Sequence, residues 1–178
     1  ATSGFTGKVP GALLKAWAKA DTAVFVEAGT CEGESGPWVE LRSGMRTVIG
    51  PMADTEFPQW RKLIPEDPPV QVALPRADLL KAATGDEITL TIDGDTLTVT
   101  SESDGVTTEQ AIKLYQTVRN TYEGPFTVSI RSGYVADCLK QVTTGLVLLS
   151  GTAPDKPVVF QSVGEAQTHL IMPVRKAG

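Results

Sequence analysis

The chain has 178 residues, of which 41% are apolar, and a formal net charge of -5. This length is enough for one large or two small domains with a hydrophobic core. An acidic excess that is spread evenly over the surface argues against a nucleic-acid-binding protein. The sequence has no apolar run of about 18 residues and its residues 1–10 carry no targeting pattern, so we expect a soluble, unexported protein.

Three segments of the chain repeat the order strand, short helix, strand: residues 5–29, 70–94 and 126–151. Amphipathic helices are expected at 10–20, 76–84 and 131–144. Two more strands follow in each repeat, at 38–44 and 46–52, at 95–103 and 110–117, and at 157–163 and 168–174. The alternation in EITLTIDGDTLTVTS (87–101) predicts a hairpin that turns at its DGD. Each repeat is therefore a βαβββ unit, and its small apolar surface requires packing against another unit.

A proline-rich segment, DTEFPQWRKLIPEDPPV (54–70), separates the first repeat from the second and lacks periodicity. Such a segment is typical of a linker or a domain boundary. The second and third repeats have no such break between them. We therefore predict a half domain of one βαβββ unit at residues 1–56, a linker at 57–69, and a complete domain of two units at 70–178.

The positive charge is concentrated on the predicted helices. They carry two acidic residues, Asp78 and Asp137, against six basic ones, which we name as candidate DNA-binding residues: Lys15, Lys19, Arg76, Lys81, Arg131 and Lys140. On helical wheels the lysines among them lie opposite apolar faces, which include Leu79, Leu80 and Ala83 in one helix and Tyr134, Val135, Cys138 and Val142 in another. If the helices share one surface, its basic character suits sequence-independent contact with phosphates. The alternative is that these lysines and arginines are only a solvated surface.

Three stretches resemble the bacterial DNA polymerase III beta subunit, the sliding clamp family. They are FPQWRKLIP (57–65), SGYVADCLKQV (132–142) and THLIMPVR (168–175), and their order and spacing agree with the family over nearly the whole chain. The resemblance implies an α+β DNA-clamp fold with sheets outside and helices on an inner face. This chain has three units where the family has six, so it is either a fragment or a reduced clamp. Four chains of three units would supply the twelve helices of a ring, which makes a tetramer the expected assembly of a short clamp.

The same resemblance implies a pocket that receives short peptides from polymerases and other partners. The matching positions are Pro58, Leu63, Ile171, Met172, Pro173, Val174 and Arg175. An apolar cleft with Pro and Met side chains can accept leucine and phenylalanine anchors, because Met adapts to several ligands. The alternative is that PQWRKLIP is a packed linker and LIMPV a core strand.

The sequence offers no constellation that is typical of an enzyme. The single histidine, His169, is not accompanied by a GxSxG motif, and the DGD at 93–95 is turn chemistry rather than a calcium loop. Cys31 and Cys138 lack zinc-ligand spacing, and no P-loop or GxGxxG motif is present. We therefore expect no catalytic residue, no metal and no cofactor.

The predicted function is that of a sliding-clamp-like processivity factor, which encircles duplex DNA without reading sequence and tethers a DNA polymerase through a peptide-binding pocket. We expect a cytoplasmic, nucleoid-associated homo-oligomer with no membrane partner. One alternative is a peptide-binding adaptor or decoy of clamp fold that forms no ring. Another is a structural or assembly protein that uses the repeat and leaves its lysines solvated.

Overall fold

A computed structural model describes residues 15, 25–30, 37–43, 46–51, 59–103, 105–164 and 166–174. The chain divides into two compact units, Ala1–Gln59 and Trp60–Gly178, which we treat separately. The division lies inside the segment 57–69 that the sequence assigns to a linker. None of the described helices is long and apolar enough to cross a membrane.

The first unit contains a three-stranded antiparallel sheet of β1 (Phe25–Thr30), β2 (Pro37–Ser43) and β3 (Arg46–Pro51), in that order. The central strand buries Val39 and Leu41, and Glu40 between them is buried as well. The strands expected at 38–44 and 46–52 are thus confirmed. The preceding strand and helix, expected between residues 5 and 20, lie outside the described residues except for Lys15, which is helical and exposed.

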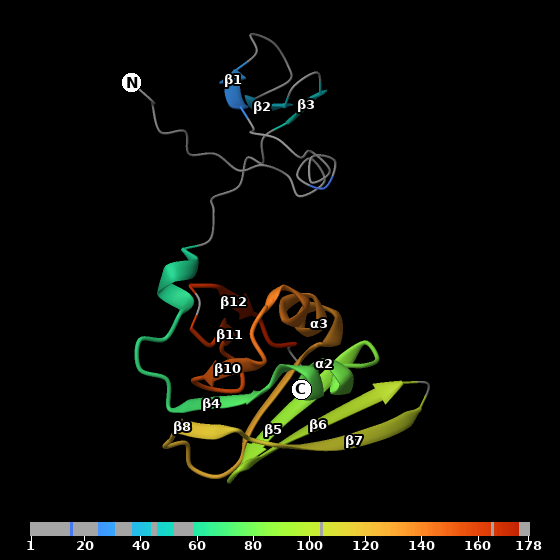
Figure 1. Cartoon of the computed structure of the whole chain (residues 1–178), viewed down its shortest axis with the longest axis vertical. Coiled ribbons are helices and arrows are strands. Elements are labelled where there is room, and N and C mark those ends of the chain that lie inside the picture. Colours follow the sequence, from blue (N-terminus) through green and yellow to red (C-terminus); the bar gives the residue numbers. More distant parts are fainter. Residues whose placement is uncertain are drawn as a thin grey trace. The chain divides into compact units, whose positions relative to one another are not determined.

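The second unit contains a short 3-10 helix, two α-helices and nine strands within the residues described (Figure 1). In chain order they are η1 (Trp60–Leu63), β4 (Val70–Pro75), α2 (Arg76–Ala82), β5 (Glu87–Asp93), β6 (Thr96–Ser103), β7 (Val106–Lys113), β8 (Gln116–Asn120), β9 (Phe126–Arg131), α3 (Ser132–Gln141), β10 (Leu146–Gly151), β11 (Val158–Ser162) and β12 (Thr168–Ile171).

The two repeats of this unit exchange their first strands. One sheet has the order β7-β6-β5-β9 and the other β12-β11-β10-β4-β8, so β4 pairs with β10 and β9 pairs with β5. The first residue of each helix is likewise hydrogen-bonded to the other repeat. The Arg76 amide donates to the Gly145 carbonyl at 3.0 Å, and the Ser132 amide donates to the Asp86 carbonyl at 3.1 Å. Neither repeat can therefore complete its own sheet without the other.

The prediction of a single strand at 110–117 is wrong, because this segment is divided between two strands, β7 and β8. The Leu114 amide still bonds to the Asp95 carbonyl beside β6, whereas the next amide, that of Tyr115, bonds to the Ala73 carbonyl of β4. The chain thus passes from one sheet to the other between these two residues. A continuous alternation cannot predict this crossing, because it does not say which neighbour supplies the hydrogen bonds.

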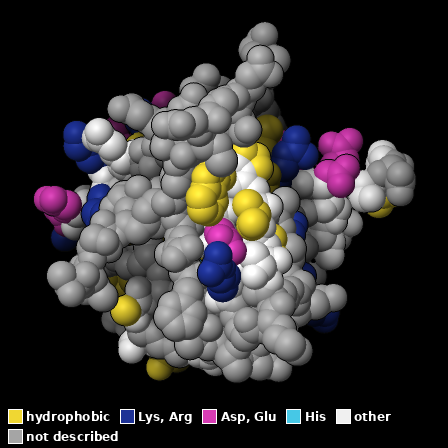
Figure 2. Space-filling model, turned by 90° about the horizontal axis from the view of Figure 1, so that it is seen from above, with side chains coloured by type: hydrophobic (Ala, Val, Ile, Leu, Met, Phe, Trp, Pro, Cys, Tyr) yellow, Lys and Arg dark blue, Asp and Glu magenta, His cyan; other side chains and the backbone are white. Residues whose placement is uncertain are grey.

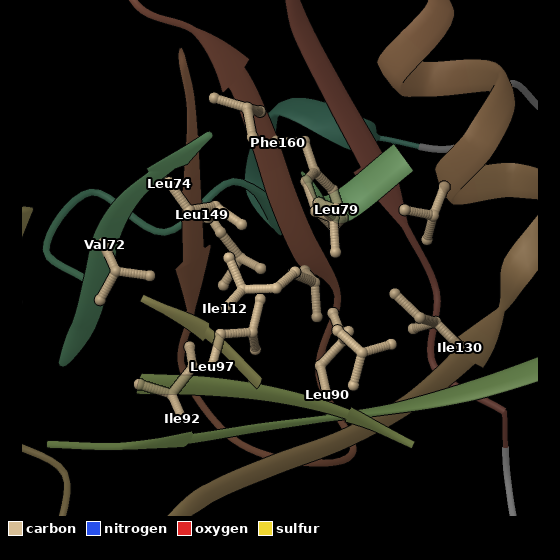
Figure 3. Close-up of a cluster of buried hydrophobic side chains, with 14 of the residues drawn as sticks. Val72, Leu74, Leu79, Leu90, Ile92, Leu97, Ile112, Ile130, Leu149 and Phe160 are labelled. Atoms are coloured by element: carbon tan, nitrogen blue, oxygen red, sulfur yellow. The ribbon is translucent and has the colours of Figure 1, made fainter. Parts of the chain in front are cut away.

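One hydrophobic core lies between the two sheets and under both helices (Figure 3). Alternate residues of β5, β6 and β9 point into it, among them Leu90, Leu97 and Ile130, and Leu149 and Phe160 enter from the other sheet. Helix α2 contributes Leu79 and Ala82, and α3 contributes Val135, Cys138 and Leu139. The expected apolar face of α3 is wrong at Tyr134, which is 62% exposed, and it omitted Leu139, which is fully buried.

Candidate functional site

A groove of about 960 Å³ runs between helix α3 and strand β12. One wall of the groove is formed by helix α3. The four residues of this wall are spaced three or four positions apart or are adjacent, so they lie on one side of the helix. The residues that line it are Tyr134, Asp137, Cys138 and Gln141 from the helix, and Thr168, His169, Leu170, Ile171 and Met172 from β12 and the residue after it.

The groove combines an apolar floor with exposed side chains at its rim. Ile171 and Cys138 are buried below it, whereas Tyr134 is 62% and Met172 54% exposed. Burial raises the pKa of the Cys138 thiol to about 12, so this side chain behaves as a small apolar group at neutral pH. The buried Nε2 of His169 finds no hydrogen-bond partner among the described residues. The groove therefore combines apolar surface at Ile171, Cys138 and Met172 with polar lining residues, Asp137, Gln141, Thr168 and His169.

The predicted pocket residues are distributed over more than one surface. Ile171 and Met172 line the groove between α3 and β12, but Pro173 and Val174 line a separate groove of about 540 Å³ beside Thr127 and Ser129 of β9. The Val174 amide donates to the Ser129 carbonyl at 2.8 Å, which directs the chain away from β12. Leu63 is 42% exposed in η1 and lines neither groove. Pro58 and Arg175 lie outside the described residues.

Sequence reasoning did not assign Tyr134 to the site. A helical wheel placed it with the core residues, yet it stands at the border of that face, next to the stripe that continues with Asp137 and Gln141. The mixture of an aromatic residue with polar ones at a spacing of three and four residues was the available signal. Such a stripe indicates a helix face that lies partly against another part of the protein and partly against solvent.

The predicted DNA-binding residues occupy different environments. Lys15, Lys81, Arg131 and Lys140 are exposed, and Lys19 lies outside the described residues. Arg76 is half-buried, and its Nε donates to the Leu139 carbonyl at 2.7 Å, which ties the start of α2 to α3. This charge-assisted bond uses a carbonyl near the helix end that lacks an intrahelical partner.

The exposed charges on and beside α2 and α3 nearly balance. Three basic residues, Lys81, Arg131 and Lys140, accompany the acidic Asp78 and Asp137, and the Lys140 ammonium lies 3.2 Å from the Asp137 carboxylate. Figure 2, which draws the whole chain and not these two helices alone, shows the described Lys and Arg side chains as separate spots with Asp and Glu side chains near several of them. Phosphate contacts from this one domain are therefore expected to be weak.

The described residues contain no group of three or more His, Cys, Asp or Glu that could hold a metal ion. No family model matches the sequence, and no curated protein matches it either.

Solved structures of bacterial sliding clamps, in contrast, are similar over most of the chain. The DNA polymerase III subunit beta sliding clamp of Bartonella birtlesii, bound to griselimycin, has a TM-score of 0.64 and 19% identity, and the match covers 78% of this chain and 39% of the clamp. The beta subunit of Thermotoga maritima has a TM-score of 0.63 and 18% identity over 79% of this chain and 40% of that one. The sliding clamp of Bacillus subtilis has a TM-score of 0.62 and 19% identity over 79% and 39%.

This chain spans about 40% of the length of these clamps. The match agrees with the βαβββ units that the sequence predicts from its repeats. At this identity the likeness establishes architecture. The chain has the α+β fold of the bacterial DNA polymerase III beta sliding clamp.

Proposed function

We propose that this chain acts as a clamp-type accessory factor in DNA replication, which holds duplex DNA topologically and tethers a DNA polymerase through the groove between α3 and β12. The observation that carries the proposal is the clamp fold itself, at a TM-score of 0.64 over 78% of the chain. A protein of this kind works by binding rather than by catalysis, and it acts in the cytoplasm on the nucleoid. In it, residues 70–178 form a complete clamp domain and residues 1–56 half of another.

The groove between α3 and β12 supports the proposal that this chain tethers a DNA polymerase. Its ligand is a short peptide that inserts leucine or phenylalanine side chains above Ile171, between Tyr134 and Met172. Methionine adjusts its shape to different anchors, and tyrosine supplies contact area with few rotatable bonds. Leu63, Pro173 and Val174, with Pro58 and Arg175, extend the predicted contact surface beyond this groove.

The nearly balanced charge of α2 and α3 determines how DNA is retained. Exposed Lys81, Arg131 and Lys140 of one domain, helped by Lys15 and Lys19 of the first unit, provide interchangeable and weak phosphate contacts. Arg76 contributes less, because its guanidinium already bonds to Leu139. Retention therefore depends on a closed ring, for which four chains of three units supply twelve helices.

A second candidate function is a peptide-binding adaptor of clamp fold that forms no ring. The pairing of Lys140 with Asp137 favours it, since it removes free positive charge from the helix face. An adaptor is expected to be a monomer or a dimer with affinity for peptide and none for DNA.

Two measurements separate these functions. Retention of the protein on circular and on linearised duplex DNA is compared by gel filtration, because only a closed ring is lost from DNA ends.

A fluorescent peptide with leucine and phenylalanine anchors is titrated into wild type, Met172→Ala and Tyr134→Ala. Each substitution is expected to weaken binding about tenfold. Tyr115→Ala is the matched control, since Tyr115 is 68% exposed but lies outside the groove. Equal retention on both DNA forms excludes the ring, and unchanged peptide affinity excludes the groove.

A further inference from the structure

Each repeat of the second unit has its sheet completed by a strand of the other repeat. A repeat consists of a first strand, a helix and three consecutive antiparallel strands, which we call the meander: β5-β6-β7 in one repeat and β10-β11-β12 in the other. The edge of β5 that faces away from β6 pairs with β9 over six residues, and the corresponding edge of β10 pairs with β4 over six. In this unit a first strand therefore joins the meander of the other repeat and not its own.

The first unit contains the same meander with one edge left open. Its strands are β1, β2 and β3, and β1 has the position that β5 and β10 have in the second unit. Among the described residues, none pairs with the edge of β1 that faces away from β2. The first strand of this repeat is expected at residues 5–10, which align with 70–75 and 126–131. An open edge is a template for pairing with another strand.

The two strand pairs that join the repeats of the second unit follow one register. In both, the last residue of the first strand lies opposite the first residue of the meander, as in the pairs Pro75–Leu146 and Arg131–Glu87. The equivalent residues of the first repeat are Pro10 and Phe25. The same register therefore sets Val9 opposite Val26 and Lys8 opposite Glu27.

This register gives the first repeat pairs whose chemistry matches those of the second unit. The pair Val9–Val26 takes the place of two apolar pairs that are fully buried, Ile88–Ile130 and Val147–Leu74. An apolar pair at this position belongs to the inner face of a complete domain.

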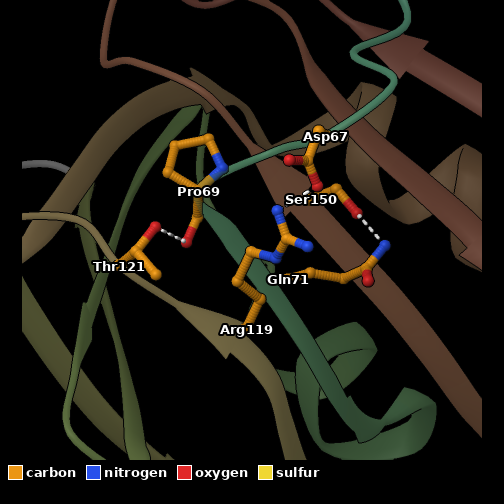
Figure 4. Close-up of polar contacts among 6 residues, drawn as sticks. All are labelled: Asp67, Pro69, Gln71, Arg119, Thr121 and Ser150. Atoms are coloured by element: carbon orange, nitrogen blue, oxygen red, sulfur yellow. Dashed lines mark hydrogen bonds and ion pairs between the residues drawn. The ribbon is translucent and has the colours of Figure 1, made fainter.

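Polar residues that lie opposite each other also join the exchanged strands of the second unit. The Gln71 side chain of β4 donates to the Ser150 hydroxyl of β10 at 3.3 Å (Figure 4). The Thr89 and Ser129 hydroxyl oxygens, on β5 and β9, lie 2.9 Å apart. The pair Lys8–Glu27 takes the place of Thr89 and Ser129, so an ion pair replaces this hydrogen bond.

We propose that the first repeat of this chain forms a complete two-repeat domain with the first repeat of a second copy. Residues 5–10 of each copy pair antiparallel with the open edge of β1 in the other, with Lys8 opposite Glu27. Each repeat has one strand to give and one open edge, so two identical repeats complete each other about a two-fold axis. The two repeats of the second unit already show this reciprocal arrangement within one chain.

The charges on the strands of the first unit favour this partner. In the register between β1 and β2, Glu27 lies opposite Glu40, and like charges in that position destabilise a strand pair. Arg42 forms an ion pair with Glu40. Lys8 of the second copy supplies a cation on the other side of β1, beside Glu27.

The inference goes beyond the proposed function and is tested without DNA or peptide. The dissociation constant of the full chain is measured by sedimentation equilibrium for wild type, Lys8→Glu, Glu27→Lys and the double charge swap. Each single substitution is expected to weaken association at least about tenfold, since it replaces two attractive cross-strand pairs by repulsive ones. The double swap should restore it. Lys156→Glu, on the exposed loop before β11, is the matched charge-reversal control and should leave association unchanged.

A pair of cysteines shows whether the strand comes from the same copy or from the second one. Gly7 lies opposite Ala28 in the proposed register, so Gly7→Cys with Ala28→Cys, in a Cys31→Ser background, brings two thiols within reach of a disulfide. Oxidation should give a covalent dimer on a non-reducing denaturing gel.

Four outcomes overturn the inference. A wild-type chain that stays monomeric at all concentrations has no such contact. Association that neither single substitution weakens does not use this edge of β1. A charge swap that fails to restore association shows that Lys8 and Glu27 do not meet. A disulfide that forms within one chain shows that residues 5–10 pair with β1 of their own repeat.

Discussion

Substitution of Gly151 by alanine should destabilise the second unit, because a methyl group at this position has no room. Gly151 ends β10 opposite Val70, and a Cβ built there would lie 2.8 Å from Cε1 and 3.2 Å from Cε2 of Phe126, with Cζ closer still. The Phe126 ring is 1% exposed and packs edge-on against Tyr122 at 5.3 Å between centroids. It cannot move away without disturbing the core.

The expected cost follows from this overlap. Extra atoms in a well-packed core typically cost about 1–3 kcal/mol, and the contact with a rigid ring favours the upper half of that range. We expect a loss of about 2 kcal/mol in the free energy of unfolding and a drop of about 5–10 °C in Tm. Urea unfolding followed by circular dichroism measures the first, and a thermal scan measures the second.

A double-mutant cycle tests the cause. In a Phe126→Leu background the ring is gone, so Gly151→Ala should cost less than about 1 kcal/mol there. Gly133→Ala is the matched control: Gly133 lies in α3 with nothing within 4 Å of its added Cβ, so the substitution should be neutral or stabilise by about 0.5–1 kcal/mol. Equal costs of Gly151→Ala in both backgrounds would refute the steric reasoning.

Three other expectations concern single side chains. Arg76→Met removes the bond from the Arg76 guanidinium to the Leu139 carbonyl and should cost about 1.5–3 kcal/mol in urea unfolding; a cost below about 0.5 kcal/mol would mean that the bond contributes nothing. Because burial raises the pKa of Cys138 to about 12, iodoacetamide at pH 8 should label it only in denaturant, as mass spectrometry of the native and unfolded chain would reveal. A hydrogen bond from Arg42 lowers the pKa of Glu40, so its stabilising contribution is present above the ordinary Glu range and is lost as pH falls through the lowered value. The difference in unfolding free energy between wild type and Glu40→Gln should therefore be larger at pH 7 than at pH 3, and a difference that is independent of pH would contradict the pairing.

Part of the fold could be predicted from local pattern. The threonine-rich alternation of residues 87–101 gave the hairpin β5–β6, because a period of two assigns one face to the core and the other to solvent. Helical periodicity correctly predicted buried Leu79 in α2 and most of the buried positions of α3, but it missed buried Ala82, and the expected Leu80 and Ala83 are only partly buried. Repetition of this order along the chain predicted βαβββ units, and the clamp-type architecture was implied by the resemblance of FPQWRKLIP, SGYVADCLKQV and THLIMPVR to the sliding clamp family.

The site was harder to predict than the fold. Ile171 and Met172 were expected in a pocket, but Tyr134 was expected in the core, although it forms the opposite rim of the groove. A wheel gives the direction of a side chain around one helix axis and contains no information on where β12 will lie. Pro173 and Val174, adjacent in sequence to Met172, face a different groove because a single hydrogen bond to Ser129 turns the chain.

The sequence by itself determined which residues alternate, which helical faces are apolar and where the repeats begin, since these depend on interactions within a few residues. Only the tertiary structure decided that β4 joins β10, that β9 joins β5, and that the chain changes sheets between Leu114 and Tyr115. The physical reason is that the backbone groups of a strand can bond equally well to many partners. The choice among partners is made by the packing of the whole core, in which each repeat completes the sheet of the other.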